Sequence, residues 1–325
     1  MVKNFFFGRV CLAETVYCLY LYLLLCDERS FANTFFFLSS GIPRHIREKF
    51  DNFEYMSSEV YLEDQHSYRV NLRRTAIFKW PFLATAKIYG QDHLFFVSSL
   101  TYNRSINVIE DGLNSYNNNI FAASYPMRTF ENWFYYGPKY SDPQFGAAKY
   151  AKKVYLRGFA PIVDQLKRKA EIIDIDSLWN SKSDSYKEKI LSIFNVDSDD
   201  LNNLKGRDVI LLTQPYARLG VPENELMAIY RRMIEPFDRS RVIIKVHPTD
   251  SANYREAFND VFVYDKIVPM ELLTMIGNHF LEALTIASTA VFTLPQPVKI
   301  HFAGHSVHPV LVEKFGTCEY EDFIK

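Results

Sequence analysis

The chain has few of the features that mark specialised classes of protein. It contains only four cysteines, Cys11, Cys18, Cys26 and Cys318, and no two of them have CxxC spacing. Because this is too sparse for a disulfide framework, we expect buried, reduced thiols and a reducing, cytoplasmic compartment. The formal net charge of −1 gives no global sign of nucleic-acid binding. Internal repeats and low-complexity tracts are also missing, which excludes a repeat array.

Signals for hydrolase and metal chemistry are weak as well. No GxSxG motif is present, so a serine hydrolase of the α/β-hydrolase kind is not expected. His301, His305 and His308 lie close together in the sequence, but glycine, serine and proline between them interrupt any helix that could gather them around a metal. No Asp-x-Asp triplet lies where a metal-bridged diphosphate would need it. We therefore predict neither a metal nor a cofactor.

The longest apolar run, Val10–Cys26, is 17 residues long and includes Glu14. It is shorter than the roughly 20 residues that span a bilayer. We interpret the region as the first strand–helix unit of the fold, with the strand at Phe5–Phe7 and the helix opening at Ala13–Thr15. The alternative is a membrane anchor.

The composition is that of an ordinary folded protein, with 48% hydrophobic and 23% charged residues, and the length of 325 suits two domains. In the first half, apolar strand patterns alternate with longer helical ones. The predicted strands are Asn4–Phe7, Thr34–Leu38, His93–Val97 and Ile106–Ile109, and the predicted helices are Pro43–Phe50 and Arg73–Tyr89. This alternation is typical of a parallel sheet covered on both faces.

A polar stretch from about Asp174 to Arg207, with a short helix at Tyr186–Phe194, precedes a second alternation. The predicted strands there are Val209–Leu212, Val242–Val246, Val261–Tyr264 and Thr289–Phe292, and the predicted helices are Pro222–Phe237 and Met270–Gly277. The fold prediction is therefore α/β, with two Rossmann-like domains that face a central cleft. The acceptor-side domain covers 1–185 with a linker to about 207, and the nucleotide-sugar domain covers 208–325.

Basic residues are concentrated between Lys149 and Lys169. They are Lys149, Lys152, Lys153, Arg157, Lys167, Arg168 and Lys169. Two interpretations stay open, a solvated helix face or a patch that meets anionic lipid at the inner face of the cell membrane. A homodimer also stays open.

The first motif that could take part in catalysis is Glu110-Asp111-Gly112, which directly follows an apolar strand. A carboxylate at a strand end can take a proton from an attacking hydroxyl, and glycine allows a tight turn beside a ligand. An ordinary acidic turn is the alternative.

The second motif is Lys245-Val246-His247-Pro248, at the end of another apolar strand. A cation and an imidazole at a strand end suit a phosphate that carries away negative charge.

The third motif is Glu271 with Ser288-Thr289 further along. An acidic residue near a helix start can bind ribose hydroxyls, and small hydroxyl residues at a turn can bind phosphate. A plain helix cap is the alternative for Ser288 and Thr289.

Taken in this order, the three motifs resemble those of bacterial sialyltransferases with the GT-B arrangement. The size and motifs are similar to glycosyltransferase family 52, which includes lipooligosaccharide and capsule sialyltransferases. The resemblance covers these motifs and the order of strands.

The resemblance implies a role for each motif residue. Asp111, beside Gly112, would be the general base, and His247 would bind the phosphate of CMP with Lys245 and Pro248 alongside. Glu271 would hold the ribose, and Ser288 and Thr289 would bind phosphate oxygens. In some family members the base lies in the loop after the first strand of the second domain. That loop has no acid here until Glu223, so Glu223 and Glu225 are the reserve candidates.

The implied function is transfer of sialic acid from CMP-sialic acid to a terminal sugar, galactose above all, of a surface glycan or glycolipid. A base on one side and phosphate donors on the other predict inversion without a covalent intermediate. The alternatives are another glycosyltransferase, such as one that transfers glucose, and a non-catalytic nucleotide-sugar-binding protein.

Overall fold

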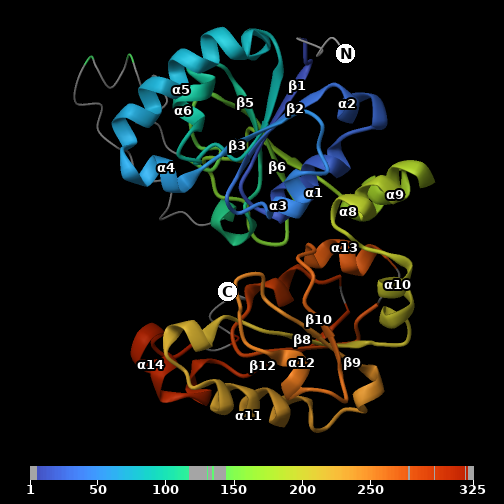
Figure 1. Ribbon diagram of the computed structural model, residues 1–325. Helices are drawn as coiled ribbons and strands as arrows, with labels where there is room; N and C mark the ends of the chain where they lie inside the picture. Colours follow the sequence, from blue (N-terminus) through green and yellow to red (C-terminus); the bar gives the residue numbers. More distant parts are fainter. Residues whose placement is uncertain are drawn as a thin grey trace. The chain divides into compact units, whose positions relative to one another are not determined.

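The chain forms two compact units, 1–193 and 194–325. The computed structural model describes residues 6–116, 130, 134, 144–276, 279–295, 297–318 and 320. Each unit is a separate α/β body with its own parallel sheet (Figure 1).

The described part of unit 1 contains a seven-stranded parallel sheet in the order β3-β2-β1-β4-β5-β6-β7. The strands are β1 (Arg9–Ala13), β2 (Thr34–Ser39), β3 (Phe53–Met56), β4 (Lys87–Gly90), β5 (Ile106–Ile109), β6 (Ala151–Leu156) and β7 (Ala170–Ile172). The chain builds outward from β1 to β3 and then returns to the other side of β1 with β4. The point between β1 and β4 is therefore the switch point of the sheet, where ligands of such folds bind.

Helices cover both faces of this sheet (Figure 1). They are α1 (Val16–Leu25), α2 (Glu28–Ala32), α3 (Arg44–Arg47), α4 (Ser58–Glu63), α5 (Gln65–Lys79) and α6 (Val97–Thr101), with 3₁₀ turns η1 (Pro81–Ala84) and η2 (Gly112–Tyr116). Leu72 of α5 and Leu100 of α6 share one buried cluster with Val10 and Leu12 of β1. Strand side chains alternate between faces, and Cys11 of β1 lies near Cys18 of α1, so α1 packs on the opposite face of the sheet.

The apolar run Val10–Cys26 belongs to the fold and is divided between β1 and α1. Residues 10–13 of β1 are completely buried, since the strand lies between two neighbours and is covered on both faces. Thr15 then caps α1, where its hydroxyl accepts the N–H of Cys18 at 3.2 Å. The predicted strand at Asn4–Phe7 is wrong at Phe6 and Phe7, while Asn4 and Phe5 lie outside the described residues. Across the described residues, no helix combines the length and apolar character needed to cross a membrane.

Unit 2 contains a five-stranded parallel sheet in the order β10-β9-β8-β11-β12, as far as its residues are described. The strands are β8 (Val209–Leu212), β9 (Val242–Lys245), β10 (Phe262–Tyr264), β11 (Glu282–Thr285) and β12 (Lys299–Phe302). The chain again builds to one side, from β8 to β10, and then crosses to the other side with β11. The switch point of this sheet therefore lies between β8 and β11.

The helical elements of unit 2 bury mainly aliphatic and tyrosine side chains against this sheet. They are α10 (Ser198–Leu204), α11 (Glu223–Ile234), α12 (Tyr254–Ala257), α13 (Met270–Met275) and α14 (Pro309–Phe315), with 3₁₀ turns η5 (Tyr216–Leu219), η6 (Arg239–Arg241), η7 (Thr289–Thr293) and η8 (His305–Val307). The predicted helices at Pro222–Phe237 and Met270–Gly277 are confirmed as α11 and α13 within the described residues, with a proline before each.

The polar stretch between the two alternations is helical over much of its length. It forms α8 (Ile175–Asn180) and α9 (Asp184–Ile193) in unit 1 and α10 in unit 2. The predicted helix at Tyr186–Phe194 corresponds to α9, and asparagine and aspartate residues occupy turns and caps.

Several predicted elements are wrong. His93–Val97 is a turn that leads into α6, and the strand next to β1 is instead β4, which occupies the end of the predicted helix Arg73–Tyr89. Thr289–Phe292 forms the 3₁₀ turn η7, and the strand precedes it as β11. The strands β3, β6, β7 and β12 were not predicted.

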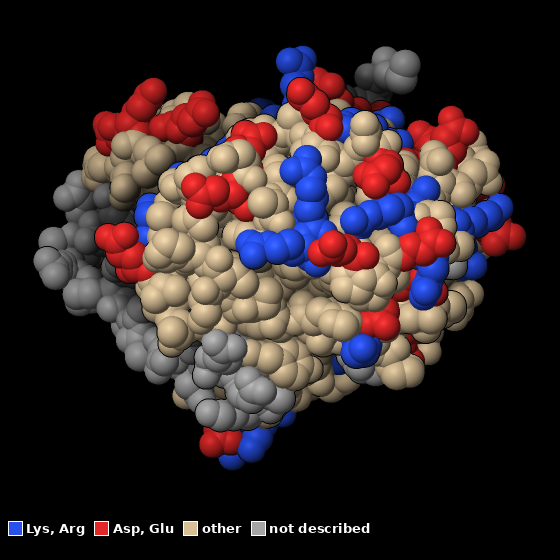
Figure 2. Space-filling model, turned by 90° about the horizontal axis from the view of Figure 1, so that it is seen from below, with Lys and Arg blue, Asp and Glu red and all other residues tan. Residues whose placement is uncertain are grey.

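The basic run Lys149–Lys169 does not form a helix, so that interpretation is wrong. It contains β6 and the turns that lead to β7. Lys153 pairs with Glu171, and Lys167 pairs with Asp164 at 2.6 Å. On the face drawn in Figure 2, acidic and basic side chains lie next to one another. The lipid-facing interpretation of the basic run stays a prediction.

Candidate active site

Gln91 connects the two strands on either side of the switch point of unit 1. It follows β4 and is 1% exposed, and its Oε1 accepts the backbone N–H of Glu14 at 2.7 Å and of Thr15 at 3.4 Å, just after β1. The preceding Gly90 has a φ of +128°, and a Cβ there would lie 1.9 Å from the carbonyl oxygen of Leu12. Only glycine therefore fits at the point where β4 delivers Gln91.

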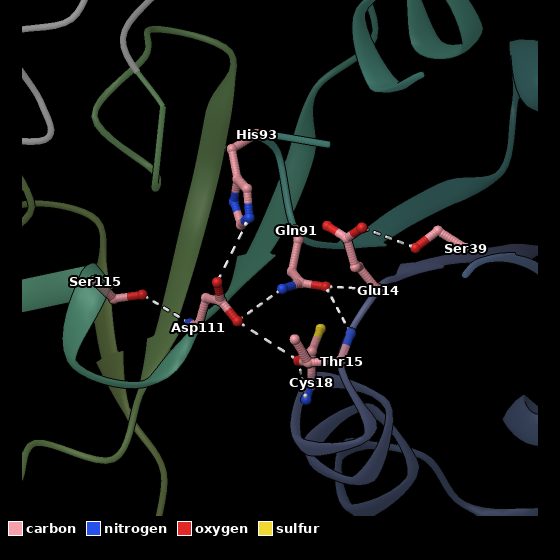
Figure 3. Close-up of polar contacts among 8 residues, drawn as sticks. All are labelled: Glu14, Thr15, Cys18, Ser39, Gln91, His93, Asp111 and Ser115. Atoms are coloured by element: carbon pink, nitrogen blue, oxygen red, sulfur yellow. Dashed lines mark hydrogen bonds and ion pairs between the residues drawn. The ribbon is translucent and has the colours of Figure 1, made fainter. Parts of the chain in front are cut away.

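Asp111, at the end of β5, extends its carboxylate toward this bridge (Figure 3). Its Oδ1 accepts a hydrogen bond from Nε2 of Gln91 at 2.8 Å and lies 3.5 Å from the Thr15 hydroxyl. Its backbone N–H donates to Oγ of Ser115 at 2.8 Å, which secures the turn at its own position. The loops after β1, β4 and β5 thus converge on one carboxylate.

The second oxygen of Asp111 faces an imidazole. Nε2 of His93 lies 3.5 Å from Oδ2 of Asp111, and both side chains are 17% exposed. The His93 ring stacks on Phe145, with ring centres 4.3 Å apart and planes at 20°. Asp111 therefore has one oxygen bound by the protein and one beside a titratable ring, an arrangement suited to proton transfer.

Glu110, the neighbouring carboxylate, has a different environment. It is fully buried and accepts hydrogen bonds from the Tyr116 hydroxyl at 2.6 Å, from the Arg157 backbone N–H at 2.8 Å, and from the Tyr17 hydroxyl. Burial is the main cause that raises the pKa of Glu110, and the hydrogen bonds from Tyr116 and Tyr17 oppose it. Glu110 therefore holds the ends of β5 and β6 together, while Gly112, with a φ of +56°, turns the chain into η2.

In unit 2, His247 follows β9 and is tied to the end of β8. Its backbone N–H donates to Oγ1 of Thr213 at 3.0 Å. Nδ1 of the ring accepts the N–H of Thr249 at 3.2 Å, so the proton of the neutral ring is on Nε2. Burial lowers the pKa of His247. The imidazole is thus a neutral N–H donor near pH 7.

Lys245 is buried at the end of β9. Its ammonium donates to the backbone carbonyls of Val246 at 3.2 Å and Lys266 at 3.0 Å. Burial lowers the pKa of Lys245 to about 8. The ammonium therefore holds the loops after β9 and β10, and Pro248 lies exposed beyond His247.

The remaining predicted donor-site residues follow β10 and β11. Ser288 is buried, and its N–H donates to Oγ1 of Thr285 at 2.8 Å, while Thr289 is exposed in the first turn of η7. Glu271 is buried in the first turn of α13, which follows β10. Because β10, β9, β8 and β11 are adjacent and parallel, Glu271, His247 and Ser288 all follow the carboxyl ends of strands at one edge of the sheet.

The reserve base candidates have partners within unit 2. Oε1 of Glu223 accepts the N–H of Asn253 at 3.2 Å, and Oε2 of Glu225 lies 3.0 Å from Nε2 of His308. His301 pairs with Glu282, and Nδ1 of His305 lies 3.2 Å from the Gly316 carbonyl oxygen. The three histidines thus have separate partners, and no cluster able to hold a metal ion is found among the described residues.

Two Asp-x-Asp triplets in the chain begin at helix caps. Asp174 accepts the N–H of Ser177 at 3.1 Å at the start of α8. Asp197 accepts the N–H of Asp200 at 2.9 Å at the start of α10 and pairs with Lys266 at 2.8 Å. Both aspartates are thus engaged in helix capping.

Gln91, Thr15 and His93 are missing from the predicted site residues, as is Thr213. A glutamine or threonine carries no charge signal in a sequence, and His93 falls inside a segment predicted as strand. The signal available was the polar turn Gln91-Asp92-His93 after Gly90, which becomes informative once β4 is placed beside β1.

Solved structures share this architecture. The α/β-galactoside α-2,3-sialyltransferase of Photobacterium phosphoreum is 14% identical, with a TM-score of 0.56 over 92% of this chain and 90% of that chain. The GT-B domain of a sialyltransferase from Photobacterium damselae is also 14% identical, with a TM-score of 0.55 over 90% of each chain. At this identity the likeness concerns the fold. Two Rossmann-like units with polar strand ends at their switch points define the fold class, GT-B.

The family follows from the sequence comparison. The model of glycosyltransferase family 52 matches residues 39–311, and the chain belongs to this family. A protein of Haemophilus influenzae, named only as uncharacterized, is 34% identical over 235 residues, which cover 72% of this chain and 73% of the relative. The protein is therefore a glycosyltransferase.

Proposed function

We propose that this glycosyltransferase is an inverting, metal-independent sialyltransferase that uses CMP-sialic acid as donor. The observation that carries the proposal is Asp111, a partly accessible carboxylate held at the switch point of unit 1 with one oxygen left for a substrate proton. Membership of family 52 and a fold shared with two bacterial sialyltransferases support the choice of sugar.

The reaction needs one base and one leaving-group site. The acceptor hydroxyl gives its proton to Asp111 as its oxygen forms a bond to the anomeric carbon of sialic acid. The bond from that carbon to the phosphate oxygen breaks, and its electron pair leaves with CMP. Attack opposite to the leaving phosphate inverts the anomeric carbon, and no covalent intermediate with the protein is required.

We assign binding of the donor, CMP-sialic acid, to unit 2. Nε2–H of His247 would donate to the phosphate of CMP, and the hydroxyl groups of Ser288 and Thr289 would bind phosphate oxygens. A neutral imidazole suits this role because it donates a hydrogen bond to the phosphate as negative charge develops there. Glu271 would accept hydrogen bonds from the ribose hydroxyls. Lys245 would act indirectly, by holding the strand end that carries His247.

The acceptor in this proposal is a terminal galactose of a bacterial surface glycan or glycolipid. The Photobacterium phosphoreum enzyme with the same fold acts, by its name, on α- and β-galactosides. A galactose-terminated oligosaccharide is therefore the first acceptor to test.

The decisive experiment combines a nucleotide screen with Asp111→Asn. CMP should raise the melting temperature of the wild type more than UDP, UMP or GDP does. Asp111→Asn should lower turnover of CMP-sialic acid about 10²- to 10⁴-fold, the usual contribution of a general base, and should keep CMP binding. Asp51→Asn, an exposed change in the same unit, is the matched control.

Two results would overturn the proposal. Stabilisation by UDP alone would move the donor to another nucleotide sugar, such as a glucosyl donor. Unreduced turnover by Asp111→Asn would show that Asp111 is not the base.

A further inference from the structure

We propose that Gln91 is the positioning residue that holds Asp111 ready as the base. This inference rests on the proposed function, because it concerns how the same carboxylate is kept able to accept a proton. Gln91 is 1% exposed and lies between the ends of β1, β4 and β5, where Figure 3 shows it joining Glu14, Thr15 and Asp111.

The surroundings of Gln91 leave one orientation for its amide. Two backbone N–H groups, those of Glu14 and Thr15, point at its Oε1 at 2.7 and 3.4 Å. A backbone N–H can only donate, so the group facing it must be the carbonyl oxygen and not the NH₂. The NH₂ group is therefore directed at Oδ1 of Asp111, 2.8 Å away. The backbone of the loop after β1 thus orients the amide of Gln91 so that it donates to the carboxylate of Asp111 in the loop after β5.

This donor decides which oxygen of Asp111 reacts. Oδ1 is occupied by Gln91 and lies near the Thr15 hydroxyl, while Oδ2 faces His93 at 3.5 Å. The amide NH₂ of Gln91 can only donate, so it binds Oδ1 as an acceptor and leaves Oδ2 for the substrate. Oδ2 is then the oxygen that takes the proton of the acceptor hydroxyl.

Other ionisable groups near Asp111 come from all the elements packed around it. None of them is substituted in the experiment on Gln91 below. They are Glu14, Tyr17 and Cys18 after β1, Asp92 and His93 after β4, Glu110 and Tyr116 after β5, and Arg157 after β6.

Gln91→Glu changes the donor without changing the shape of the side chain. One carboxylate oxygen can still accept the N–H groups of Glu14 and Thr15, so the other must meet Oδ1 of Asp111. Two carboxylates at this separation share one proton. The base then becomes available only at higher pH, so the acid limb of the kcat/KM profile should move up by about one pH unit or more.

The experiment measures kcat and KM for CMP-sialic acid across pH in the wild type, Gln91→Glu and Gln65→Glu. Gln65 lies at the exposed start of α5 and is the isosteric control, with an unmoved profile expected. Gln91→Glu should lose about tenfold in kcat near neutral pH, keep KM within about threefold, and recover activity as pH rises. A role in folding alone would not produce that recovery.

The outcomes separate this inference from the proposed function. A profile of Gln91→Glu that coincides with the wild type, while Asp111→Asn is inactive, overturns the role of Gln91 and leaves the base in place. Full activity of Asp111→Asn overturns the proposed function itself. If Gln91→Glu does not fold, Gln91→Met serves instead, because it cannot donate to Asp111. It should lower kcat about tenfold or more, and an unchanged kcat would refute the inference.

Discussion

The two strand-end sites are built in different ways. At the switch point of unit 1, buried and half-buried side chains bond to one another, as Gln91 does to Asp111 and Tyr116 does to Glu110. At the edge of the sheet in unit 2, side chains bond mainly to the backbone, as Thr213 does to the N–H of His247. This difference fits the roles proposed above, because a base must be held in place before the substrate arrives, whereas groups that bind a donor need hydrogen-bonding capacity for the ligand itself.

The two sites also differ in the charged groups that they contain. The unit 1 site gathers the carboxylates of Glu14, Glu110 and Asp111, whereas the unit 2 site has the carboxylate of Glu271 together with an imidazole and hydroxyl groups. All three carboxylates of the unit 1 site accept hydrogen bonds: Glu110 at both oxygens, Glu14 from the Ser39 hydroxyl at 3.1 Å, and Asp111 from Nε2 of Gln91 at 2.8 Å. In the function proposed above, unit 2 would bind the anionic donor and unit 1 the neutral hydroxyl of the acceptor.

The largest expected effect comes from removing the buried carboxylate of unit 1. Glu110→Ala leaves the hydroxyls of Tyr17 and Tyr116 and the N–H of Arg157 without their acceptor, so we expect a loss of about 3 kcal/mol in the free energy of unfolding. Urea denaturation followed by circular dichroism measures it.

A substitution at the site in unit 2 serves as the control for Glu110→Ala. Ser288→Ala in unit 2 should cost less than about 1 kcal/mol, and Glu63→Ala on exposed α4 should stay within about 0.5 kcal/mol. Equal losses for Glu110→Ala and Ser288→Ala would remove the contrast between the two sites.

A smaller effect is expected for the imidazole of unit 2, this time on binding. His247→Ala should weaken CMP binding about tenfold, or about 1.4 kcal/mol, with little change in stability. Burial lowers the pKa of His247, so the ring gains charge only as pH falls below its usual range. The ratio of wild-type to variant affinity should therefore rise from about pH 7 to about pH 5. Calorimetric titration of both proteins measures it.

His45→Ala, at an exposed position of α3, is the control for this titration. Because both proteins bind the same nucleotide, the titration of CMP itself cancels in the ratio. Equal affinities of the wild type and His247→Ala at every pH would contradict a phosphate contact.

Local patterns were sufficient for part of this fold. β8 and β9 were predicted because each is a short apolar run that ends at a turn, and α11 because proline and glutamates mark its start. β4 was missed because it has only four residues, begins with exposed Lys87 and directly follows a helical pattern. His93–Val97 has the composition of a strand, yet Phe96 and Val97 are buried at the start of α6, so tertiary packing decided its structure.

The same distinction applies to the candidate site. Asp111 and His247 could be named as candidates because each is an ionisable residue that closely follows an apolar strand. Gln91 could not, because its proposed role depends on β4 lying beside β1, a pairing between residues 78 apart in the chain that no local pattern contains. The chain order also could not show that Glu110 is the buried member of its pair and Asp111 the accessible one.

The smallest expected effect tests how unit 2 holds its strand end. Burial lowers the pKa of Lys245 to about 8 from 10.5, so below about pH 8 both folded and unfolded chains carry the proton. Above it the folded protein releases the proton while the unfolded chain keeps it, so the contribution of Lys245 to stability rises with pH. Burial raises the pKa of the Cys11, Cys18 and Cys26 thiols, which lowers stability over the same range but does so equally in every variant. We therefore expect the free energy of unfolding of the wild type minus that of Lys245→Met to grow by about 1 kcal/mol between about pH 8 and pH 9. Urea denaturation measures this difference, and the exposed control Lys314→Met should follow the wild type. Parallel curves for the wild type and Lys245→Met would mean that the ammonium of Lys245 is not buried.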